Sequence, residues 1–122
     1  MNTTPQPTEI TLHQQSKMLE LAFDDGARYK LPAEFLRVYS PSAEVIGHGE
    51  GQETLQVGKR NVGIKAVEPV GQYAIKLVFD DRHDSGLYSW DYLYGLGRDQ
   101  EILWHNYLHR LEAAGASRDP AK

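Results

Sequence analysis

The feature that most constrains the fold of this chain is a turn signal, Asp24-Asp25-Gly26, between two segments of alternating apolar and polar residues. On both sides of the turn every second residue is apolar: Leu19, Leu21, Phe23, Ala27, Tyr29 and Leu31. Successive side chains of a strand point to opposite faces, so this alternation predicts two strands with one buried face. Glycine after aspartate readily adopts the positive φ of a tight hairpin turn. Because Ile10 and Leu12 alternate in the same way upstream, the sequence predicts an antiparallel meander of three short strands.

A second hairpin is predicted further along the chain. Apolar residues alternate over 62–66 and again over 73–79, and the turn is expected at Pro69–Gly71. Between the two hairpin groups, Pro32–Val38 predicts a short helix, because proline is favoured in the first helical turn. The helix is expected to stop at Ser40-Pro41-Ser42, where a proline cannot continue it.

The C-terminal third is predicted to be helical. Leu87–Leu96 carries aromatic residues at helical spacing, and Arg98–Ala114 carries a single apolar stripe. The residues of the stripe are Leu103, Trp104, Tyr107, Leu108 and Leu111. Gly115 follows, where a glycine commonly ends a helix. The expected fold class is therefore α+β, with a small, mostly antiparallel sheet from two hairpin groups, a short helix after the first group and C-terminal helices.

Length and composition favour one domain. With 122 residues, we expect a disordered N-terminus over 1–8, the domain over 9–115 with an exposed glycine-rich loop at 47–58, and a disordered tail over 116–122. The 13 Lys and Arg against 17 Asp and Glu lack the cationic excess for nucleic-acid or anionic-membrane binding. The absence of cysteine excludes disulfides and thiolate chemistry. Without a targeting segment or a long apolar run, a cytoplasmic protein is expected.

Two histidine patterns have a spacing compatible with metal binding. His48-Gly49-Glu50 has the spacing of the first half of a two-histidine, one-carboxylate iron site, which His83 or His105 could complete. Such sites are held in a barrel far larger than the predicted sheet, so we expect none here. His105 and His109 lie four residues apart on the last predicted helix, a spacing that can hold a metal ion from one face. Because they lie nearly opposite the apolar stripe, we expect an exposed, solvated pair.

The turn after the second hairpin gathers residue types used in hydrolysis: Asp80, Asp81, His83, Asp84 and Ser85. A nucleophile, a base and an orienting acid should converge from separate elements around an oxyanion site. These residues are instead neighbours in one turn, where aspartate and serine are common turn formers and helix caps. No catalytic residue is therefore predicted.

Aromatic residues are concentrated in the C-terminal third: Tyr88, Trp90, Tyr92, Tyr94, Trp104 and Tyr107. Most should pack in the core, because tyrosine and tryptophan bury large areas. Aromatic residues are also enriched at the centres of protein interfaces. We therefore expect His83, Tyr88, Trp90 and Tyr94 to be the candidates for contact with a partner.

Two segments resemble a known family. They are Leu31–Gly49, LPAEFLRVYSPSAEVIGHG, and Leu77–Gly97, LVFDDRHDSGLYSWDYLYGLG, followed by LWHNYLHRL from Leu103. The order of these motifs is similar to that of the gamma-butyrobetaine hydroxylase-like N-terminal domain, long catalogued as a domain of unknown function. The resemblance runs from about Glu9 to Gly115 and makes this chain look like a stand-alone bacterial member.

The resemblance implies a zinc site that has lost most of its ligands. In hydroxylases acting on gamma-butyrobetaine and trimethyllysine, this domain holds a structural zinc ion through three cysteines and one histidine. The cysteine positions fall on Ser40, Ser42 and Val45, and the histidine position on His83. Serine is a poor zinc ligand and valine is none, so the resemblance implies these positions as vestigial and zinc is not expected.

The resemblance implies an accessory role more than an enzymatic one. In the hydroxylases the catalytic domain, with its iron ligands, is separate from this domain, and in plastid proteins a similar domain is joined to a P-loop iron–sulfur scaffold. We therefore expect a non-catalytic accessory or protein-interaction domain with an unknown protein partner. The alternative is a metal-binding accessory protein of iron or iron–sulfur metabolism, with His83 and Asp80, Asp81 or Asp84 as ligands.

Overall fold

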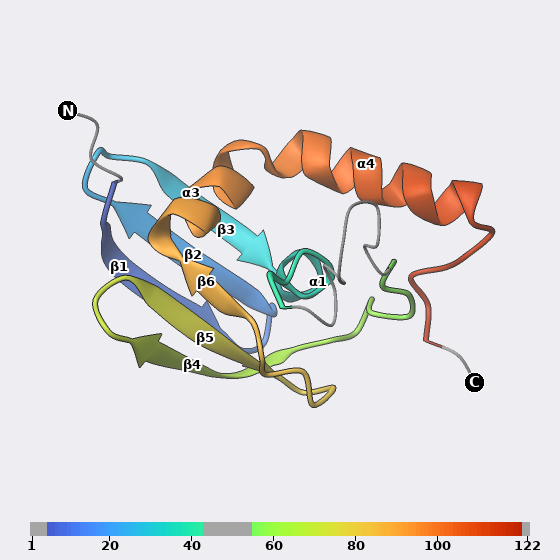
Figure 1. Cartoon of the computed structure of the whole chain (residues 1–122), viewed down its shortest axis with the longest axis horizontal. Coiled ribbons are helices and arrows are strands. Elements are labelled where there is room, and N and C mark those ends of the chain that lie inside the picture. The colour runs from blue at the N-terminus through green and yellow to red at the C-terminus, as the bar shows by residue number, and fades with distance from the viewer. Residues whose placement is uncertain (1–4, 43–54, 121–122) are drawn as a thin grey trace.

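Two small antiparallel sheets face each other in the structure, a computed structural model that describes residues 5–42 and 55–120 (Figure 1). The strand order is β1-β2-β3 in one three-stranded sheet and β4-β5-β6 in the other. The described elements are β1 (Pro7–His13), β2 (Met18–Phe23), β3 (Arg28–Pro32), α1 (Ala33–Val38), β4 (Ile64–Val70), β5 (Ala74–Phe79), β6 (Leu87–Ser89), α3 (Trp90–Arg98) and α4 (Gln100–Ala113). The predicted α+β class is confirmed.

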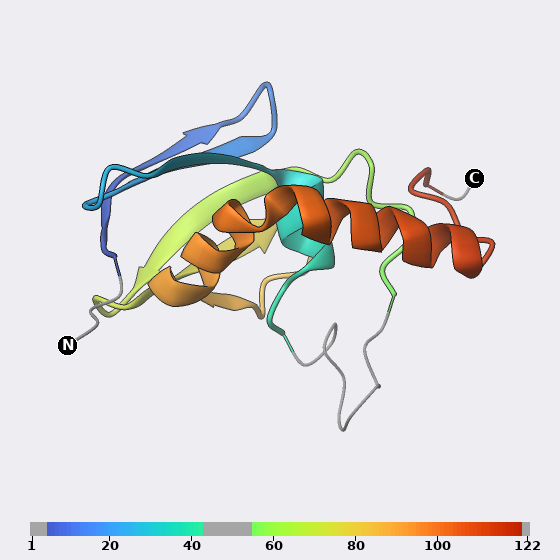
Figure 2. The same cartoon turned by 90° about the horizontal axis from the view of Figure 1, so that it is seen from above.

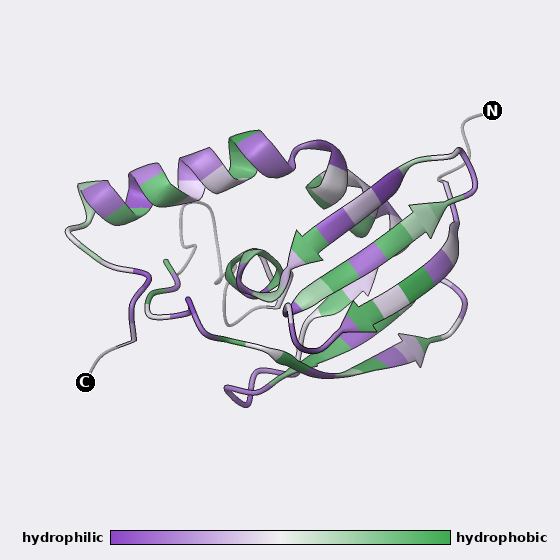
Figure 3. Ribbon diagram, turned by 180° about the vertical axis from the view of Figure 1, so that it is seen from behind, coloured by the Kyte–Doolittle hydropathy of each residue, from purple (hydrophilic) through white to green (hydrophobic). Residues whose placement is uncertain are grey.

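The first sheet is the predicted meander. Leu19 pairs with Leu12 on one side and with Leu31 on the other, which places the alternating apolar residues of all three strands on one face. That face is buried, and Figure 3 shows the alternation of apolar and polar residues along the strands. At the turn, Gly26 has a φ of 91°, and the Asp25 carboxylate accepts a hydrogen bond from the backbone N–H of Ala27.

The second sheet differs from the prediction in two places. Its hairpin turn lies at 71–73 and not at Pro69–Gly71, because β4 extends through Pro69 to Val70. Proline is tolerated there because β4 is an edge strand, where a missing backbone N–H need not break the pairing. Leu87–Ser89 was expected to be helical but forms β6, in which Tyr88 pairs with Ile75 of β5. Here the gain from pairing and burial outweighs the helical spacing of the aromatic residues. Helix α3 begins only at Trp90, where the Ser89 hydroxyl accepts the N–H of Tyr92.

Helix α1 lies at one end of the two sheets, and α3 packs against β3 and β6 (Figure 1). Every residue of α1 is buried, including Glu34 and Arg37, because α1 lies between the sheets and α4 (Figure 2). The last predicted helix begins at Gln100 rather than at Arg98, since Asp99 separates α3 from α4. Gly115, with a φ of 63°, follows α4 as expected.

The C-terminal segment 116–120 was expected to be disordered, but the structure holds it against the rest of the domain. The backbone N–H groups of Gly58 and Arg60 donate to the carbonyls of Ser117 and Arg118. The Arg118 guanidinium makes two hydrogen bonds of 2.7 Å to the Glu34 carboxylate and lies 5.0 Å from the centre of the Trp104 ring. The order of this segment comes from partners far away in the sequence, which a local pattern does not reveal.

Candidate functional site

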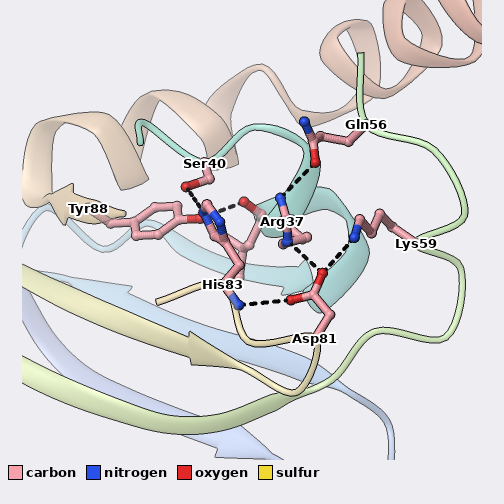
Figure 4. A network of polar contacts seen from close by, with 8 residues as sticks. Arg37, Ser40, Gln56, Lys59, Asp81, His83 and Tyr88 are labelled. Atoms are coloured by element: carbon pink, nitrogen blue, oxygen red, sulfur yellow. Dashed lines mark hydrogen bonds and ion pairs between the residues drawn. The ribbon is translucent and has the colours of Figure 1, made fainter. Parts of the chain in front are cut away.

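The zinc positions implied by the resemblance lie where the end of α1 meets the turn after β5. Ser40 follows α1 and His83 lies in that turn, and their side chains meet in the interior (Figure 4). The Ser40 hydroxyl lies 2.8 Å from His83 Nε2, and the two residues are only 1% and 4% exposed. The sequence motif correctly places these two positions together, although 43 residues separate them.

The local backbone explains why His83 points inward. Arg82 adopts a left-handed φ of 74°, and the N–H of Phe79 donates to the His83 carbonyl, which closes a tight turn after β5. The Asp81 carboxylate accepts the His83 N–H at 3.2 Å and fixes the turn further. On the other side, a Cβ at Gly86 would collide with the Ser40 hydroxyl, so glycine permits the close approach of the two segments.

The residues at the implied zinc positions do not fit a zinc ion. The Ser40 hydroxyl is bonded to His83, and the Ser42 hydroxyl lies 2.7 Å from the Ser85 hydroxyl. A structural zinc site needs four thiolate, imidazole or carboxylate ligands, and two neutral hydroxyls already engaged with other side chains do not supply them. Val45 lies outside the described residues. Ser40 and His83, which would share a zinc ion in the implied site, are joined by a direct hydrogen bond instead.

A second polar cluster surrounds Asp81. Its carboxylate accepts hydrogen bonds from Arg37 at 2.8 Å and from Lys59 at 2.7 Å, and Arg37 also donates to the Gln56 side chain at 3.0 Å (Figure 4). Burial raises the pKa of the Asp81 carboxyl, but the hydrogen bonds and positive charges of Lys59 and Arg37 outweigh it, so the pKa lies below its ordinary value. Asp81 is therefore an anion held by two cations. Sequence reasoning missed this cluster, because its members come from three distant segments.

The side chains considered as iron ligands, His83 with Asp80, Asp81 or Asp84, do not form a metal-binding group within the described residues. The Asp81 carboxylate is bound to cations and the His83 ring to Ser40, while Asp84 is exposed. Within residues 5–42 and 55–120, no three His, Asp or Glu side chains form a group able to hold a metal ion. The His48-Gly49-Glu50 motif lies outside these ranges.

Two of the four candidates for partner contact are buried. Tyr88 is 0% exposed, and its hydroxyl donates to the Leu36 carbonyl at 2.6 Å, while burial raises its pKa. With His83 also buried, neither side chain offers a surface to a partner, so that part of the expectation is wrong. The reason is that β6 turns Tyr88 into the space between the sheet and α1, where its large ring fills the core.

Trp90 and Tyr94 are half-buried. The indole N–H of Trp90 donates to the Gln72 carbonyl at 2.8 Å. The Tyr94 hydroxyl donates to the Asp25 carboxylate at 2.6 Å, and this hydrogen bond is the largest cause, before desolvation, of a Tyr94 pKa raised to about 12. Both aromatic rings therefore have fixed positions and retain some exposed surface.

Trp90 lines an open, apolar pocket between the two sheets. The pocket has a volume of about 420 Å³, and all its lining residues are apolar: Ile10, Leu12, Val67, Pro69, Ile75 and Trp90. It lies where β1 and β4, one edge strand of each sheet, approach each other. The sequence contained a signal for this position, because a proline within an alternating run marks an edge strand.

His105 and His109 lie on the outer face of α4, as the sequence predicts. Both are exposed, and their ring centres are 6.5 Å apart. Helix α4 instead buries Tyr107 and Leu111. None of the helices within the described residues is long and apolar enough to cross a membrane.

Two facing three-stranded sheets with α1 at one end and two C-terminal helices define a small α+β domain. Residues 10–94 match the family described as gamma-butyrobetaine hydroxylase-like, N-terminal, and the chain belongs to this family. No curated protein matches the chain.

Solved structures of similar chains support the same assignment. A protein solved by NMR in solution is 56% identical, with a TM-score of 0.85 over 98% of this chain and 94% of its own. A second NMR structure is 54% identical, with a TM-score of 0.82 over 100% of this chain and 93% of its own. A crystal structure from Acidithiobacillus ferrooxidans ATCC 23270 is 36% identical, with a TM-score of 0.64 over 75% of this chain and 92% of its own. That protein belongs to the DUF971 family and has unknown function.

Proposed function

We propose that this chain is a non-catalytic, cytoplasmic accessory domain that binds another protein through the apolar pocket beside Trp90. The occupant would be an apolar side chain on an exposed segment of the partner. One observation carries the proposal: an open pocket of about 420 Å³ whose lining residues are all of apolar type and include a half-buried tryptophan. Apolar pockets with an aromatic side chain are typical of the energetic centres of protein interfaces.

The state of the polar groups supports a role without catalysis. In the structure, Ser40, His83 and Asp81 lie together and combine the residue types of a hydrolytic set. The first two are buried and bonded to each other, and the third is held by two cations. A general base must reach a substrate proton directly or through one water molecule. Because these groups are directed at one another, we infer a structural role for them.

The test compares a pocket variant with a matched surface variant. Pro69→Glu places a charge at the exposed rim of the pocket, and Ile102→Glu places the same charge on α4, where Ile102 is 62% exposed. Each protein is used to capture partners from lysate of the source cells, and each captured protein is then purified and titrated by calorimetry. We expect Pro69→Glu to weaken binding at least about tenfold, since a charge facing an apolar surface costs several kcal/mol when desolvated.

Ile102→Glu should bind as the wild type does. Circular dichroism and thermal unfolding of both variants serve as the control for folding. A partner that binds both variants equally, or the failure of any captured protein to bind after purification, would contradict the pocket proposal. Elemental analysis of untagged protein tests the alternative of a metal-binding accessory protein, which requires iron near one atom per chain.

A further inference from the structure

The outer face of α4 carries two imidazoles that the proposed function does not use. His105 and His109 are separated by one helical turn, both are exposed, and their rings are inclined by only 33° with centres 6.5 Å apart. Residues at i and i+4 lie on the same face of a helix. The two rings therefore project side by side from a 14-residue helix whose opposite face is packed on the domain.

We propose that His105 and His109 form a two-histidine site for a late first-row divalent cation, Cu²⁺, Ni²⁺ or Zn²⁺. Each imidazole supplies one nitrogen, and water fills the remaining coordination positions. Imidazole nitrogen suits these three metals, whereas Ca²⁺ and Mg²⁺ prefer oxygen ligands that these side chains lack. Among the three, Cu²⁺ should bind most tightly, following the general order of affinities for nitrogen ligands.

The helix makes the pair a chelating unit. Once one imidazole holds the cation, the second is already within one helical turn, so its binding step is intramolecular and has a high effective concentration. Linked sites gain roughly 10²–10⁴-fold in affinity by this means. Because the rings must turn toward each other to share one ion, we expect a gain in affinity at the low end of this range, about 100-fold.

The surroundings attract a cation without completing a larger site. Glu101 is exposed and lies one turn before His105 on the same row of the helix. Its negative charge raises the local concentration of cations. No group of three ligand-type side chains exists in the part of the chain that the structure describes, so two protein ligands are the expected number.

Other described histidines are engaged elsewhere. His13 lies 2.9 Å from the Glu20 carboxylate on the first sheet, and His83 is buried against Ser40. Each of these two imidazoles already has a side-chain partner on another segment of the fold. A cation that binds these histidines would therefore affect the sheets or the turn after β5, and not α4.

The experiment titrates untagged, ¹⁵N-labelled protein with Cu²⁺ and records amide spectra together with calorimetric affinities for Cu²⁺ and Ni²⁺. Paramagnetic broadening should begin on α4, around residues 101–113. His105→Ala and His109→Ala should each weaken binding about 100-fold, because either change removes the chelate. The double variant should be only slightly weaker than either single variant.

Two further variants separate geometry from the number of histidines. Adding Glu101→His to His109→Ala restores an i, i+4 pair with His105, and we expect the affinity to return to within about tenfold of wild type. Adding Asn106→His to His109→Ala gives adjacent histidines on different faces, and the affinity should stay low. Broadening centred away from α4, single variants that bind as the wild type does, or equal rescue by both added histidines would overturn the proposal.

Discussion

Removal of the Arg118 side chain should destabilise the domain by about 2–3 kcal/mol. Its guanidinium donates two hydrogen bonds to Glu34, whose side chain is only 7% exposed, and lies over the Trp104 ring. Two unit charges about 4 Å apart attract by about 4 kcal/mol at an effective dielectric of 20. Because the Arg118 side chain is 28% exposed, solvent screening reduces this to about 2 kcal/mol. The contact with the tryptophan ring adds about 0.5–1 kcal/mol.

The assay is urea unfolding followed by tryptophan fluorescence. With a urea dependence of about 2 kcal/mol per molar, Arg118→Ala should lower the unfolding midpoint by roughly 1–1.5 M. Arg60→Ala is the matched control, because Arg60 also pairs with the C-terminal segment, at Asp119, but both side chains are exposed. We expect the control to change stability by less than about 1 kcal/mol.

A double substitution isolates the buried charge. In Glu34→Met/Arg118→Met no unpaired carboxylate remains in the interior, so the double variant should be more stable than Arg118→Met alone. If Arg118→Ala lies within about 0.5 kcal/mol of wild type, or loses no more than Arg60→Ala, the reasoning that this ion pair fastens the C-terminal segment is wrong.

Three further predictions concern the interior. Asp81→Asn should destabilise the domain at neutral pH and weaken its acid dependence. The folded-state pKa of Asp81 lies below its ordinary value of 3.8. The ionised carboxylate therefore stabilises the fold fully above pH 3.8, and this stabilisation is lost as the pH falls through the lower, folded-state pKa. Unfolding curves recorded from pH 7 to 2 measure the loss. Ser40→Ala should cost about 1–3 kcal/mol in urea unfolding, because the buried His83 nitrogen loses a hydrogen bond, and a neutral result would contradict this. Gly97→Ala should lower the free energy of unfolding by about 1–3 kcal/mol, because the new Cβ would collide with an aromatic ring of β3. Gly95→Ala, which has space around the new Cβ, should be neutral or stabilising. Equal thermal midpoints for the two variants would refute the difference.

Residues close together in the sequence made much of the fold predictable. Alternation around Asp24-Asp25-Gly26 gave the first sheet its strands and its buried face, because the two-residue period of a strand is a local property. The helical pattern beyond Gln100 and the glycine at 115 likewise predicted the last helix and its end. Leu87–Ser89 was assigned wrongly because three residues carry too little local preference to outweigh pairing with β5.

The candidate site was also predictable only in part from the sequence. The family motif identified Ser40 and His83 as neighbours in space, but only the structure shows that they bond directly and lie buried. Exposure of an aromatic residue depends on what packs against it, so Tyr88 and Trp90 could not be told apart by residue type. The apolar pocket beside Trp90 needs edge strands from both sheets, and their approach is a tertiary property.

The sequence alone determined the buried face of the first sheet, the last helix and the lack of thiolate ligands, because each follows from residue type or from a short repeat. The tertiary structure decided which polar groups meet. Asp81 joins Arg37 and Lys59, and Arg118 joins Glu34 across 84 residues of chain. Charged groups brought inside a fold must find partners to offset the loss of hydration, and only the packed chain determines which partners are within reach.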